Sequence, residues 1–355
     1  MKHTDVVVVG GGQAGLAIGY YLKHRGIPFL IVDANERTGD TWRNRYDSLH
    51  LFTPRQFDGL PGLAFPGKPN GLPSKDEAAD YLEAYARHFS LPIQYRTNVI
   101  AMEQSERGFT LHTGRGDLSA RQVVVATGPF HTPWIPAFAG RLPDRVVQLH
   151  SAAYRNPAQL QPGNVLVVGA GNSGAQIAVE LARERNVSLS HGRPLHFKPL
   201  YMLGKSIFWY FDKLGLLKAD VDSGVGAWLK KQPEQIYGLD LKTMLADNTI
   251  DSFPKAVNAD ETGIHFDDGR VLRADNVIWA TGFRSDYRWI RIPAAFDDNG
   301  APIHRNGVSP VEGLFFLGLP WQSCRGSALM GWVAEDARRL AQSLEPLSSA
   351  LHMNK

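Results

Sequence analysis

Two glycine-rich turns, each set between a hydrophobic strand and a helix, constrain the fold of this chain more than any other feature. The first is Gly10-x-Gly12-x-x-Gly15, which follows the β-branched run Asp5–Val9 and precedes a helix that ends near Gly26. In such a turn the first glycine allows the tight bend, the second lets a pyrophosphate approach the backbone, and the third lets the helix pack closely on the strand. The sequence therefore predicts a βαβ unit that binds a dinucleotide.

The strand that follows this turn, Phe29–Val32, ends in an acid, Asp33. A carboxylate at this strand end accepts hydrogen bonds from ribose hydroxyls, and the helix start offers free N–H groups and a partial positive charge to phosphates. We therefore expect a nucleotide with free ribose hydroxyls at this site. The residues expected to line it are Gly10, Gly12, Gln13, Ala14, Gly15, Asp33 and Ala34.

A second turn of the same pattern begins about 160 residues further along, after the strand Asn164–Val168. Its trailing strand ends in Ser190 and, three residues on, Arg193, rather than in an acid. A carboxylate there would repel a 2′-phosphate, whereas Ser, His and Arg side chains can donate hydrogen bonds to one. The end of this strand therefore indicates a site that binds NADPH. The alternative is that Arg193 is only a solvated charge, which leaves NADH open. The turn itself consists of Gly169, Gly171, Asn172, Ser173 and Gly174.

Two dinucleotides in one chain imply electron transfer between a permanently held flavin and an exchanging nicotinamide. A third repeated motif supports the pairing, because Ala126-Thr127-Gly128 and Ala280-Thr281-Gly282 each end a buried strand. We predict an α/β fold with two Rossmann-like, three-layer dinucleotide-binding domains, the NADPH domain being inserted into the FAD domain. The predicted FAD domain spans residues 1–155 and 286–355. The predicted NAD(P)H domain spans 156–285 and carries a helical substrate or lid region at about 199–250. A last helix is expected from about 327 to 344.

Composition excludes several other functions. A net charge of +3, from 38 basic and 35 acidic residues, lacks the excess expected of a nucleic-acid-binding protein. The one cysteine, Cys324, rules out a disulfide framework and a CxxC redox pair. His50, His131, His150 and His191 are too scattered to predict a metal site, so none is predicted. The chain start lacks a charged leader with an apolar core, and no apolar run approaches the roughly 20 residues of a membrane span, so a cytoplasmic location is expected.

The motifs together resemble class B flavin-dependent monooxygenases, in particular bacterial members named after heavy-metal resistance operons and the plant YUCCA-type enzymes. The resemblance covers nearly the whole chain. Its motifs, in order, are the first glycine turn, Gly39–Trp42, Tyr46–Leu51, Ala126–Gly128, Phe138–Gly140 with His150–Tyr154, the second glycine turn, Ala280–Phe283, and Gly313–Gly318 ahead of Asp336 and Ala337.

The resemblance implies FAD as the bound cofactor and NADP(H) as the reductant, with NADH open. NADPH would reduce the flavin, oxygen would add at its C4a position, and the (hydro)peroxyflavin would oxygenate a small apolar substrate at sulfur, nitrogen or a ketone. By the same resemblance the catalytic candidates are Trp42, Phe52, His150 and Tyr154. The further cofactor candidates are Gly39, Thr41, Trp42, His50, Ala126, Thr127, Gly128, Ala280, Thr281, Gly282, Gly318 and Leu329.

Three departures from the family pattern bear on this chemistry. Nine residues separate Gly140 from His150, more than in the family fingerprint. Phe52 stands where animal-type enzymes have an asparagine that steadies the peroxyflavin, which leaves open a leakier intermediate that releases peroxide. Tyr154 replaces a tryptophan common in Baeyer–Villiger enzymes, which favours heteroatom oxidation.

Two other functions stay open. One is an NADPH oxidase or flavin reductase that produces hydrogen peroxide, and the other is a non-catalytic NAD(P)H-binding accessory protein. Residues 199–231 are rich in aromatic and aliphatic side chains, which fit helical core packing, an apolar substrate channel, or contact with a membrane or partner. The expected partners are a small-molecule substrate and O2, and a homodimer is left open.

Overall fold

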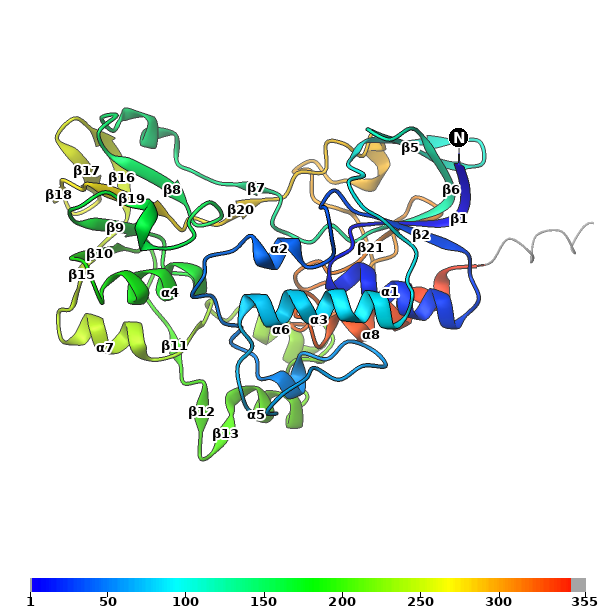
Figure 1. Cartoon of the computed structure of the whole chain (residues 1–355), viewed down its shortest axis with the longest axis horizontal. Coiled ribbons are helices and arrows are strands. Elements are labelled where there is room, and N and C mark those ends of the chain that lie inside the picture. The colour runs from blue at the N-terminus through cyan, green and yellow to red at the C-terminus, as the bar shows by residue number, and fades with distance from the viewer. Residues whose placement is uncertain (1, 346–355) are drawn as a thin grey trace, which may run out of the picture.

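The computed structural model describes residues 2–345, which form two α/β domains that lie side by side (Figure 1). The first domain lies on the right of the view, around β1 and β6, and the second on the left, around β9 and β19. The chain passes between them twice, through β7 (Thr132–Pro133) and β20 (Phe283–Arg284). These two short strands pair antiparallel, so one two-stranded connection joins the domains.

A seven-stranded sheet forms the centre of the first domain. Its strand order is β3-β2-β1-β6-β5-β4, with β21 pairing with β6 as well. β1, β2, β3, β6 and β21 run parallel, and β4, β5 and β6 form an antiparallel meander. The bounds are β1 (Lys2–Val9), β2 (Phe29–Val32), β3 (Ile93–Gln94), β4 (Val99–Ser105), β5 (Gly108–Thr113), β6 (Leu118–Val125) and β21 (Leu314–Phe316).

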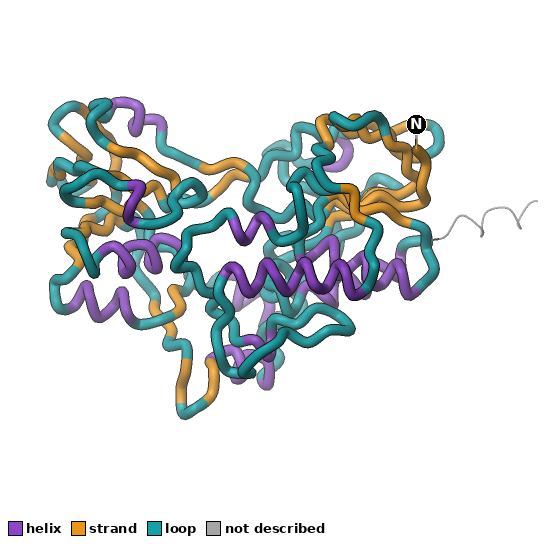
Figure 2. The backbone as a smooth tube through the Cα atoms, viewed as in Figure 1, coloured by secondary structure: helices purple, strands orange, loops and turns teal. Residues whose placement is uncertain are grey.

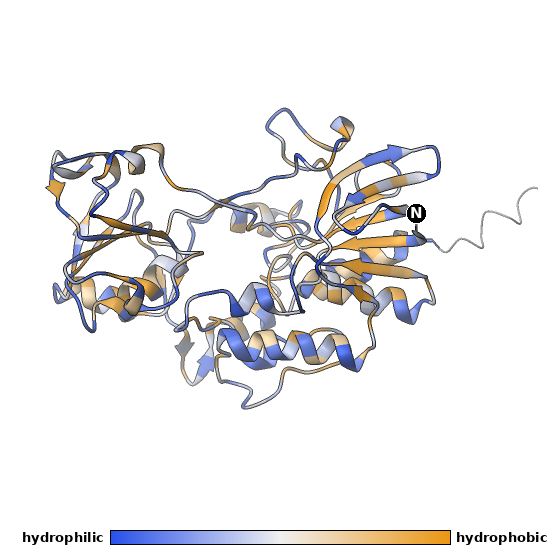
Figure 3. Cartoon of the chain, turned by 45° about the horizontal axis from the view of Figure 1, so that its top comes forward, coloured by the Kyte–Doolittle hydropathy of each residue, from blue (hydrophilic) through white to orange (hydrophobic). Residues whose placement is uncertain are grey.

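The central strand β1 is buried on both faces, which explains its run of valines. Val6 and Val8 face a layer of helices, α1 (Gln13–His24), α3 (Lys75–His88) and α8 (Val333–Ser343). Val7 and Val9 face the other layer, made by side chains of β4, β5 and residues 287–296. Figure 3 shows these strands among the most hydrophobic segments of the chain. The predicted three-layer arrangement is therefore present in this domain.

The second domain has a five-stranded, fully parallel sheet of order β15-β10-β9-β19-β8. Its strands are β8 (Val147–His150), β9 (Val165–Val168), β10 (Val187–Ser190), β15 (Ile250–Phe253) and β19 (Asn276–Trp279). One face packs against α4 (Asn172–Leu181) and α7 (Asp240–Ala246). The other face packs against a small antiparallel sheet of β16 (Ala256–Asp260), β17 (Gly263–Phe266) and β18 (Val271–Leu272). The predicted fold class, two Rossmann-like domains in one α/β chain, is confirmed.

The chain enters the second domain earlier than the predicted boundary at residue 155. Strand β8, which that boundary places in the first domain, is an edge strand of the second sheet and pairs with β19. Ala139 and Leu142 also lie in the core of the second domain. The crossover is therefore at β7, and the return is at β20, next to the predicted residue 285. The sequence of a four-residue strand does not show which of two sheets the strand joins.

The region predicted as a helical insertion, residues 199–250, is divided between two structural roles. Helix α7 contacts α4 and β15 and so belongs to the second domain. Residues 199–239 contain a hairpin of β12 (Tyr201–Met202) and β13 (Lys205–Ser206), followed by the helices α5 (Ile207–Lys213) and α6 (Gly224–Lys230). Figure 2 shows this segment below the two sheets, beside the first domain. It is only partly helical.

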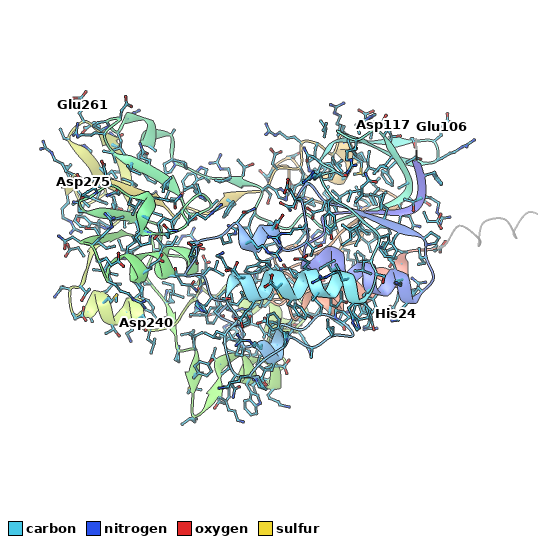
Figure 4. All side chains as sticks on the ribbon, viewed as in Figure 1. His24, Glu106, Asp117, Asp240, Glu261 and Asp275 are labelled. Atoms are coloured by element: carbon cyan, nitrogen blue, oxygen red, sulfur yellow. The ribbon has the colours of Figure 1, made fainter. Side chains whose placement is uncertain are left out.

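The last helix is shorter than predicted. Residues 319–332 form successive turns, in which the Ser327 hydroxyl accepts hydrogen bonds from the N–H groups of Ser323 and Cys324, and α8 starts only at Val333. The predicted first domain runs to residue 355, of which residues 346–355 lie outside the described residues. Within residues 2–345 no helix combines the length and the apolar character that crossing a bilayer requires. Figure 4 labels charged side chains such as Glu106 and Glu261 at the outer margins of the two domains.

Candidate functional site

The first glycine turn has the geometry that a dinucleotide requires. Gly10 has φ +109°, and a Cβ atom there would lie 2.5 Å from the Ala126 carbonyl oxygen. A Cβ atom at Gly15 would overlap the carbonyl oxygen of Gly10, so the helix start and the strand end are in direct contact. At Gly12, by contrast, a Cβ atom would meet nothing within 4 Å. The turn is closed where it packs on protein and open where a pyrophosphate would approach the backbone.

The second turn repeats this arrangement at its first and third glycines. Gly169 has φ +104°, and a Cβ atom there would overlap the carbonyl oxygen of Ala280, the counterpart of Ala126. A Cβ atom at Gly174 would overlap the Gly169 carbonyl, and at Gly171 it would meet only the tip of Glu234 at 3.8 Å. The repeated Ala-Thr-Gly motif is thus explained, because its alanine closes each turn from the neighbouring strand.

Asp33 is held against the first turn by three donors. Its Oδ2 accepts from the Gly11 N–H at 2.6 Å, and its Oδ1 accepts from the backbone and side-chain N–H groups of Asn35 at 2.7 and 2.8 Å. A carboxylate has about four lone-pair sites, so this orientation leaves acceptor capacity for ribose hydroxyls. Ala34, the next residue, is exposed. Gly318, at the end of β21, lies against Ala14 of the same turn, and a Cβ atom there would be 3.0 Å from the Ala14 Cβ.

The residues predicted for the 2′-phosphate differ in their surroundings. Ser190 is buried, and its hydroxyl donates to the Pro254 carbonyl at 2.7 Å and accepts from the Ala256 N–H at 3.2 Å. It therefore holds β10 to the chain beyond β15, and its one hydrogen-bond donor is already used by the Pro254 carbonyl. Arg193 is exposed and lines a surface pocket of about 430 Å³.

Two further cations, Lys255 and Arg270, line the same pocket, and the sequence reasoning missed both. They lie more than 60 residues beyond Arg193 in the chain, and only the pairing of β10 with β15 brings them to one edge. Arg270 is paired with Asp268 at 2.6 Å, so its charge is partly neutralised.

The segment from Gly39 to His50 runs along the side of the first domain that faces the second. Gly39 has φ +93°, and a Cβ atom there would lie 2.5 Å from the Ala79 carbonyl oxygen of α3, so this loop is held close to that helix. Trp42 is half-buried against the core of the first domain, and Thr41 is exposed. His50 is exposed, and its ring Nδ1 lies 3.0 Å from the Ser48 carbonyl oxygen.

Gln176 of α4 joins this segment to the second glycine turn. Its Nε2 donates to the His50 carbonyl at 3.1 Å, and its Oε1 accepts from the His50 N–H at 3.4 Å and from the Tyr46 hydroxyl at 3.1 Å. Three hydrogen bonds from one side chain therefore tie the helix of the second dinucleotide site to the first domain. A glutamine two residues beyond the Asn172–Gly174 stretch carries no sequence signal for this role.

His150 and Tyr154, both predicted to be catalytic, each hydrogen-bond within the second domain. The His150 Nδ1 accepts from the Ala152 N–H at 3.1 Å, so Nε2 carries the proton and donates to the Gly282 carbonyl at 2.9 Å. Burial lowers the pKa of His150, which keeps the ring neutral. Tyr154 is fully buried and donates to Glu180 at 2.9 Å. Burial raises the pKa of Tyr154 above its usual range, so the phenol stays protonated at neutral pH.

The threonines of the two Ala-Thr-Gly motifs also differ. The Thr127 hydroxyl lies 3.0 Å from Nε2 of His131, whereas the Thr281 hydroxyl donates to the Trp134 carbonyl. Gly128 and Gly282 have φ +73° and +84°, which lets the chain turn sharply into β7 and away into β20. These motifs therefore end the sheets at the point where the chain crosses between the domains.

Phe52 lies in a set of side chains that we call the aromatic cluster: Phe52, Phe208, Phe211, Tyr237 and Trp332. The ring centre of Phe52 is 4.8 Å from that of Tyr237 and 5.8 Å from that of Phe208, both in stacked geometry. Leu329 packs against the same cluster. Four distant segments thus meet at one place. Phe208 and Phe211 of the 199–231 region belong to this cluster, whereas Tyr201 and Trp228 of the same region are exposed.

The aromatic cluster is connected to the second glycine turn by Asn172. The Asn172 Oδ1 accepts from the Tyr237 N–H at 3.0 Å, and its Nδ2 donates to the Gln235 carbonyl at 3.1 Å. Ser173, the next residue, is exposed at the helix start. A nicotinamide nucleotide bound at this turn would therefore lie next to the segment that carries Tyr237.

Comparison with known proteins agrees with this geometry. The pyridine nucleotide-disulphide oxidoreductase family matches residues 7–198. An uncharacterised CzcO-like oxidoreductase of Geobacillus kaustophilus is 53% identical over 345 residues, which cover 97% of this chain and 99% of that protein. A probable indole-3-pyruvate monooxygenase of Arabidopsis thaliana, YUCCA3, is 30% identical over 91% of this chain and 84% of its own length.

Among solved structures, a flavin-containing monooxygenase from Stenotrophomonas maltophilia superposes with a TM-score of 0.80 at 26% identity, over 97% of this chain and 98% of that one. The predicted cofactors, FAD and NADP(H), are those of this family and are confirmed at that level. Both glycine turns of this chain fit such cofactors, because each is open only at its second glycine.

Proposed function

The chain belongs to the pyridine nucleotide-disulphide oxidoreductase family and is a flavin-dependent monooxygenase-like member of it. From this premise we propose that the protein oxygenates a small organic substrate and consumes NADPH and O2. FAD, held at the Gly10–Gly15 turn, supplies the oxygen-activating chemistry when bound. The NADPH at the Gly169–Gly174 turn supplies the electrons. The substrate would be a sulfur or nitrogen compound or a ketone.

One observation carries this proposal: the second glycine turn and the aromatic cluster are joined through Asn172 and Tyr237. The contact supports the proposal because the proposed site of the electron donor then lies next to the aromatic cluster. That cluster contains Phe52 and packs against Leu329, both assigned to the flavin's surroundings by resemblance. A water-poor enclosure next to the flavin is what oxygen transfer needs, since it limits the side reactions of reactive intermediates.

NADPH rather than NADH is the proposed reductant. Arg193 and Lys255 reach the pocket at the end of β10 and would pair with a 2′-phosphate there, while Arg270 adds a partly neutralised charge. Ser190 has no part in this proposed recognition, because its hydroxyl is hydrogen-bonded to the backbone at Pro254 and Ala256.

The first experiment follows the FAD-loaded protein in two steps. NADPH is added without oxygen, and bleaching of the flavin absorbance reports electron transfer. Oxygen is then admitted together with a thioether or a ketone, and NADPH consumed, oxygenated product and hydrogen peroxide are all measured. Product that accounts for most of the NADPH supports the monooxygenase.

The same measurement distinguishes the second candidate function, an NADPH oxidase. This candidate is supported by Phe52, whose ring has no hydrogen-bonding group to offer where the family's animal-type enzymes have an amide. Peroxide equal to the NADPH consumed, with every substrate tried, would replace the monooxygenase proposal by the oxidase. Absence of bleaching would remove both and favour a non-catalytic accessory protein.

The nucleotide assignment is tested separately with Arg193→Ala and Lys255→Ala. Each should raise the KM for NADPH about tenfold while leaving the KM for NADH unchanged, because only NADPH has the phosphate that these cations would bind. Arg183→Ala, an exposed charge just beyond the other end of α4, is the matched control. An unchanged ratio of the two KM values in both variants would refute the assignment.

A further inference from the structure

The hairpin of β12 and β13 projects from the molecule at the lower edge of Figure 1 and carries an exposed leucine at its tip. Leu203 is 89% exposed, and Tyr201 and Met202, which precede it, are exposed as well. Leu203 and Gly204 form the two-residue turn of the hairpin, with φ values of +48° and +74°. The tip of the hairpin is therefore both apolar and in contact with solvent.

The stability of the fold does not explain this leucine. A two-residue turn with positive φ at both positions prefers asparagine followed by glycine. A leucine with positive φ is strained, because its Cβ atom crowds the backbone carbonyl, and Leu203 gains no burial within the chain in return. A strained residue that the fold does not need points to a function.

Helix α5 extends the apolar tip into a larger surface. The Tyr210 hydroxyl donates to the Met202 carbonyl at 3.1 Å, so the hairpin lies against the helix. The Lys205 Nζ lies 5.7 Å from the ring centre of Trp209. Leu214, directly after the helix, is 70% exposed. We call the following set the hairpin surface: Tyr201, Met202, Leu203, Lys205, Trp209, Lys213 and Leu214.

The charged side chains of this region are mainly lysines. Lys205 and Lys213 are exposed and form no ion pair with the described residues, whereas Lys218 lies 3.7 Å from Asp212, the one acid of α5. Residues 198–231 contain six lysines and three aspartates, and this excess equals the net charge of +3 of the whole chain. The hairpin surface therefore combines exposed apolar side chains with a local positive charge.

We propose that the hairpin surface docks on an anionic lipid bilayer. The Leu203 and Met202 side chains would enter the boundary between headgroups and acyl chains, where apolar side chains are withdrawn from water. The rings of Tyr201 and Trp209, which have polar and apolar parts, suit the headgroup level. The lysines would pair with lipid phosphates, and their charge complements that of an anionic leaflet.

The composition and shape of the hairpin surface favour a lipid over a protein partner. Lysine is depleted in protein–protein interfaces, whereas it is attracted to anionic membranes. A stable protein interface buries about 800 Å² on each partner, and the tip of a two-residue turn offers little flat area for that purpose. The same narrow tip can enter between lipid headgroups. This inference does not depend on the proposed function.

The test measures co-sedimentation of the FAD-loaded protein with lipid vesicles. One set of vesicles is pure phosphatidylcholine, and the other contains about 30% phosphatidylglycerol, which is anionic. The wild-type protein should bind the anionic vesicles at least about tenfold more tightly than the neutral ones, since several lysines face the lipid. Salt at about 0.5 M should remove most of this difference, because it screens the charges.

Leu203→Asn separates lipid binding from folding. Asparagine is preferred at this position of the turn, so the variant should melt at a temperature no lower than that of the wild-type protein. It should bind anionic vesicles about 5- to 10-fold more weakly, because the apolar side chain at the tip is lost. Ile100→Thr is the matched control, since Ile100 is 59% exposed on β4, and it should bind like the wild-type protein.

Lys213→Gln tests the electrostatic part. It should weaken binding to the anionic vesicles about fivefold, as expected for one lysine near such a surface, and leave binding to the neutral vesicles unchanged. Lys242→Gln, which removes an exposed lysine of α7 in the second domain, is its control and should change neither.

Equal affinity of the wild-type protein for the two kinds of vesicle would overturn the proposal, as would unchanged binding in both Leu203→Asn and Lys213→Gln. Absence of vesicle binding, together with a dimer in light scattering that Leu203→Asn dissociates, would replace the bilayer by a second copy of the chain. Sedimentation needs neither NADPH nor oxygen, so its result is independent of the monooxygenase proposal.

Discussion

At the scale of the residue, the glycines of the Gly10–Gly15 turn are required for different reasons, although each is a glycine of the same sequence motif. Gly15 has the backbone of Gly10 where its Cβ would be, while Gly12 faces open space. The former is needed for folding and the latter only for the ligand. This difference gives a prediction that separates stability from cofactor binding.

Gly12→Ala should fold normally and bind FAD at least tenfold more weakly, because its methyl group would occupy the path of the pyrophosphate. Gly15→Ala should lower the free energy of unfolding by about 1–3 kcal/mol or more, since the overlap with Gly10 must be relieved by a backbone shift. Apoprotein melting and FAD titration by fluorescence measure the two effects. A Gly12→Ala apoprotein that is as unstable as the Gly15→Ala apoprotein would contradict the distinction.

Asp58 gives a second prediction at the residue scale, on how the stability of the protein depends on pH. Its carboxyl is fully buried, its Oδ1 accepts from the Thr53 hydroxyl at 2.5 Å, and its Oδ2 has no partner in the described structure. Burial raises the pKa of Asp58 from 3.8 to about 7. The folded protein therefore binds this proton more tightly than the unfolded chain does.

The sign of the effect follows from that difference. Between about pH 4 and 7 the folded state holds more protons than the unfolded state, so the contribution of Asp58 to the free energy of unfolding falls as the pH rises and levels off above pH 7. Asp58→Asn, which mimics the protonated acid, should remove this decline and be more stable than the wild-type protein at pH 8, by up to a few kcal/mol. Urea unfolding at pH 5 and pH 8 checks this. Equal pH slopes for the two proteins would show that Asp58 titrates normally.

At the scale of the element, the segment 199–239 is held to the first domain by aromatic packing and by backbone hydrogen bonds, from the Val221 N–H to Ser323 and from the Gly326 N–H to Leu217. Phe208 of α5 is fully buried, and its ring contacts those of Phe52, Tyr237 and Trp332 at centre distances of 5.8, 5.0 and 6.2 Å. The opposite side of the segment carries exposed apolar residues such as Leu203 and Leu214. Phe208 is therefore a buried side chain of this element that contacts both the first domain and the rest of the segment.

Phe208→Ala should detach the segment while the two sheets stay folded. Replacing a buried phenylalanine by alanine typically lowers stability by about 3–5 kcal/mol. Here we expect most of this loss to lower the free energy of local opening of the segment, and not that of global unfolding. Trypsin should then cut faster at lysines of the segment, such as Lys213 and Lys218, while FAD remains bound. Val225→Ala, half-exposed on α6, is the control and should digest like the wild-type protein. Unchanged cleavage of Phe208→Ala would mean that other contacts hold the element.

At the scale of the whole molecule, the two domains are positioned by a few polar contacts and the paired strands β7 and β20. The Asp47 N–H of the first-domain loop donates to the Arg155 carbonyl, and Gln176 bonds to the same loop at His50 and Tyr46. Hydride transfer between cofactors held by different domains depends on their alignment to within about an ångström. The relative position of the domains is thus a functional quantity.

Gln176→Ala should lower the rate of flavin reduction at saturating NADPH about tenfold or more, because it removes three hydrogen bonds between the domains. The dissociation constants of FAD and NADPH should stay within about twofold, since neither turn is altered. Anaerobic stopped-flow measurements follow the reduction. Gln104→Ala, exposed on β4 and remote from the junction, serves as the control. A loss of NADPH affinity at an unchanged reduction rate would be evidence against an alignment role.

The sequence by itself determined the features that depend on neighbours along the chain. The glycine turns, the strands before them and Asp33 are local patterns, and a tight strand-to-helix bend imposes the same residues wherever it occurs. For this reason the fold class and the two cofactors could be predicted, and the repeat of Ala126 in Ala280 already indicated a second unit of the same kind.

Only the tertiary structure decided which way particular side chains face and what they meet. Ser190 and Tyr154 carry polar groups suited to a site, but strand pairing and helix packing bury both against backbone or core. Arg325, which donates a hydrogen bond to the Tyr237 hydroxyl, lies 88 residues from it, and Lys255 lies 62 residues from Arg193, so no local pattern joins them. Contacts of this kind depend on how whole elements pack, and the entropy of closing such long loops is overcome only by the folded core.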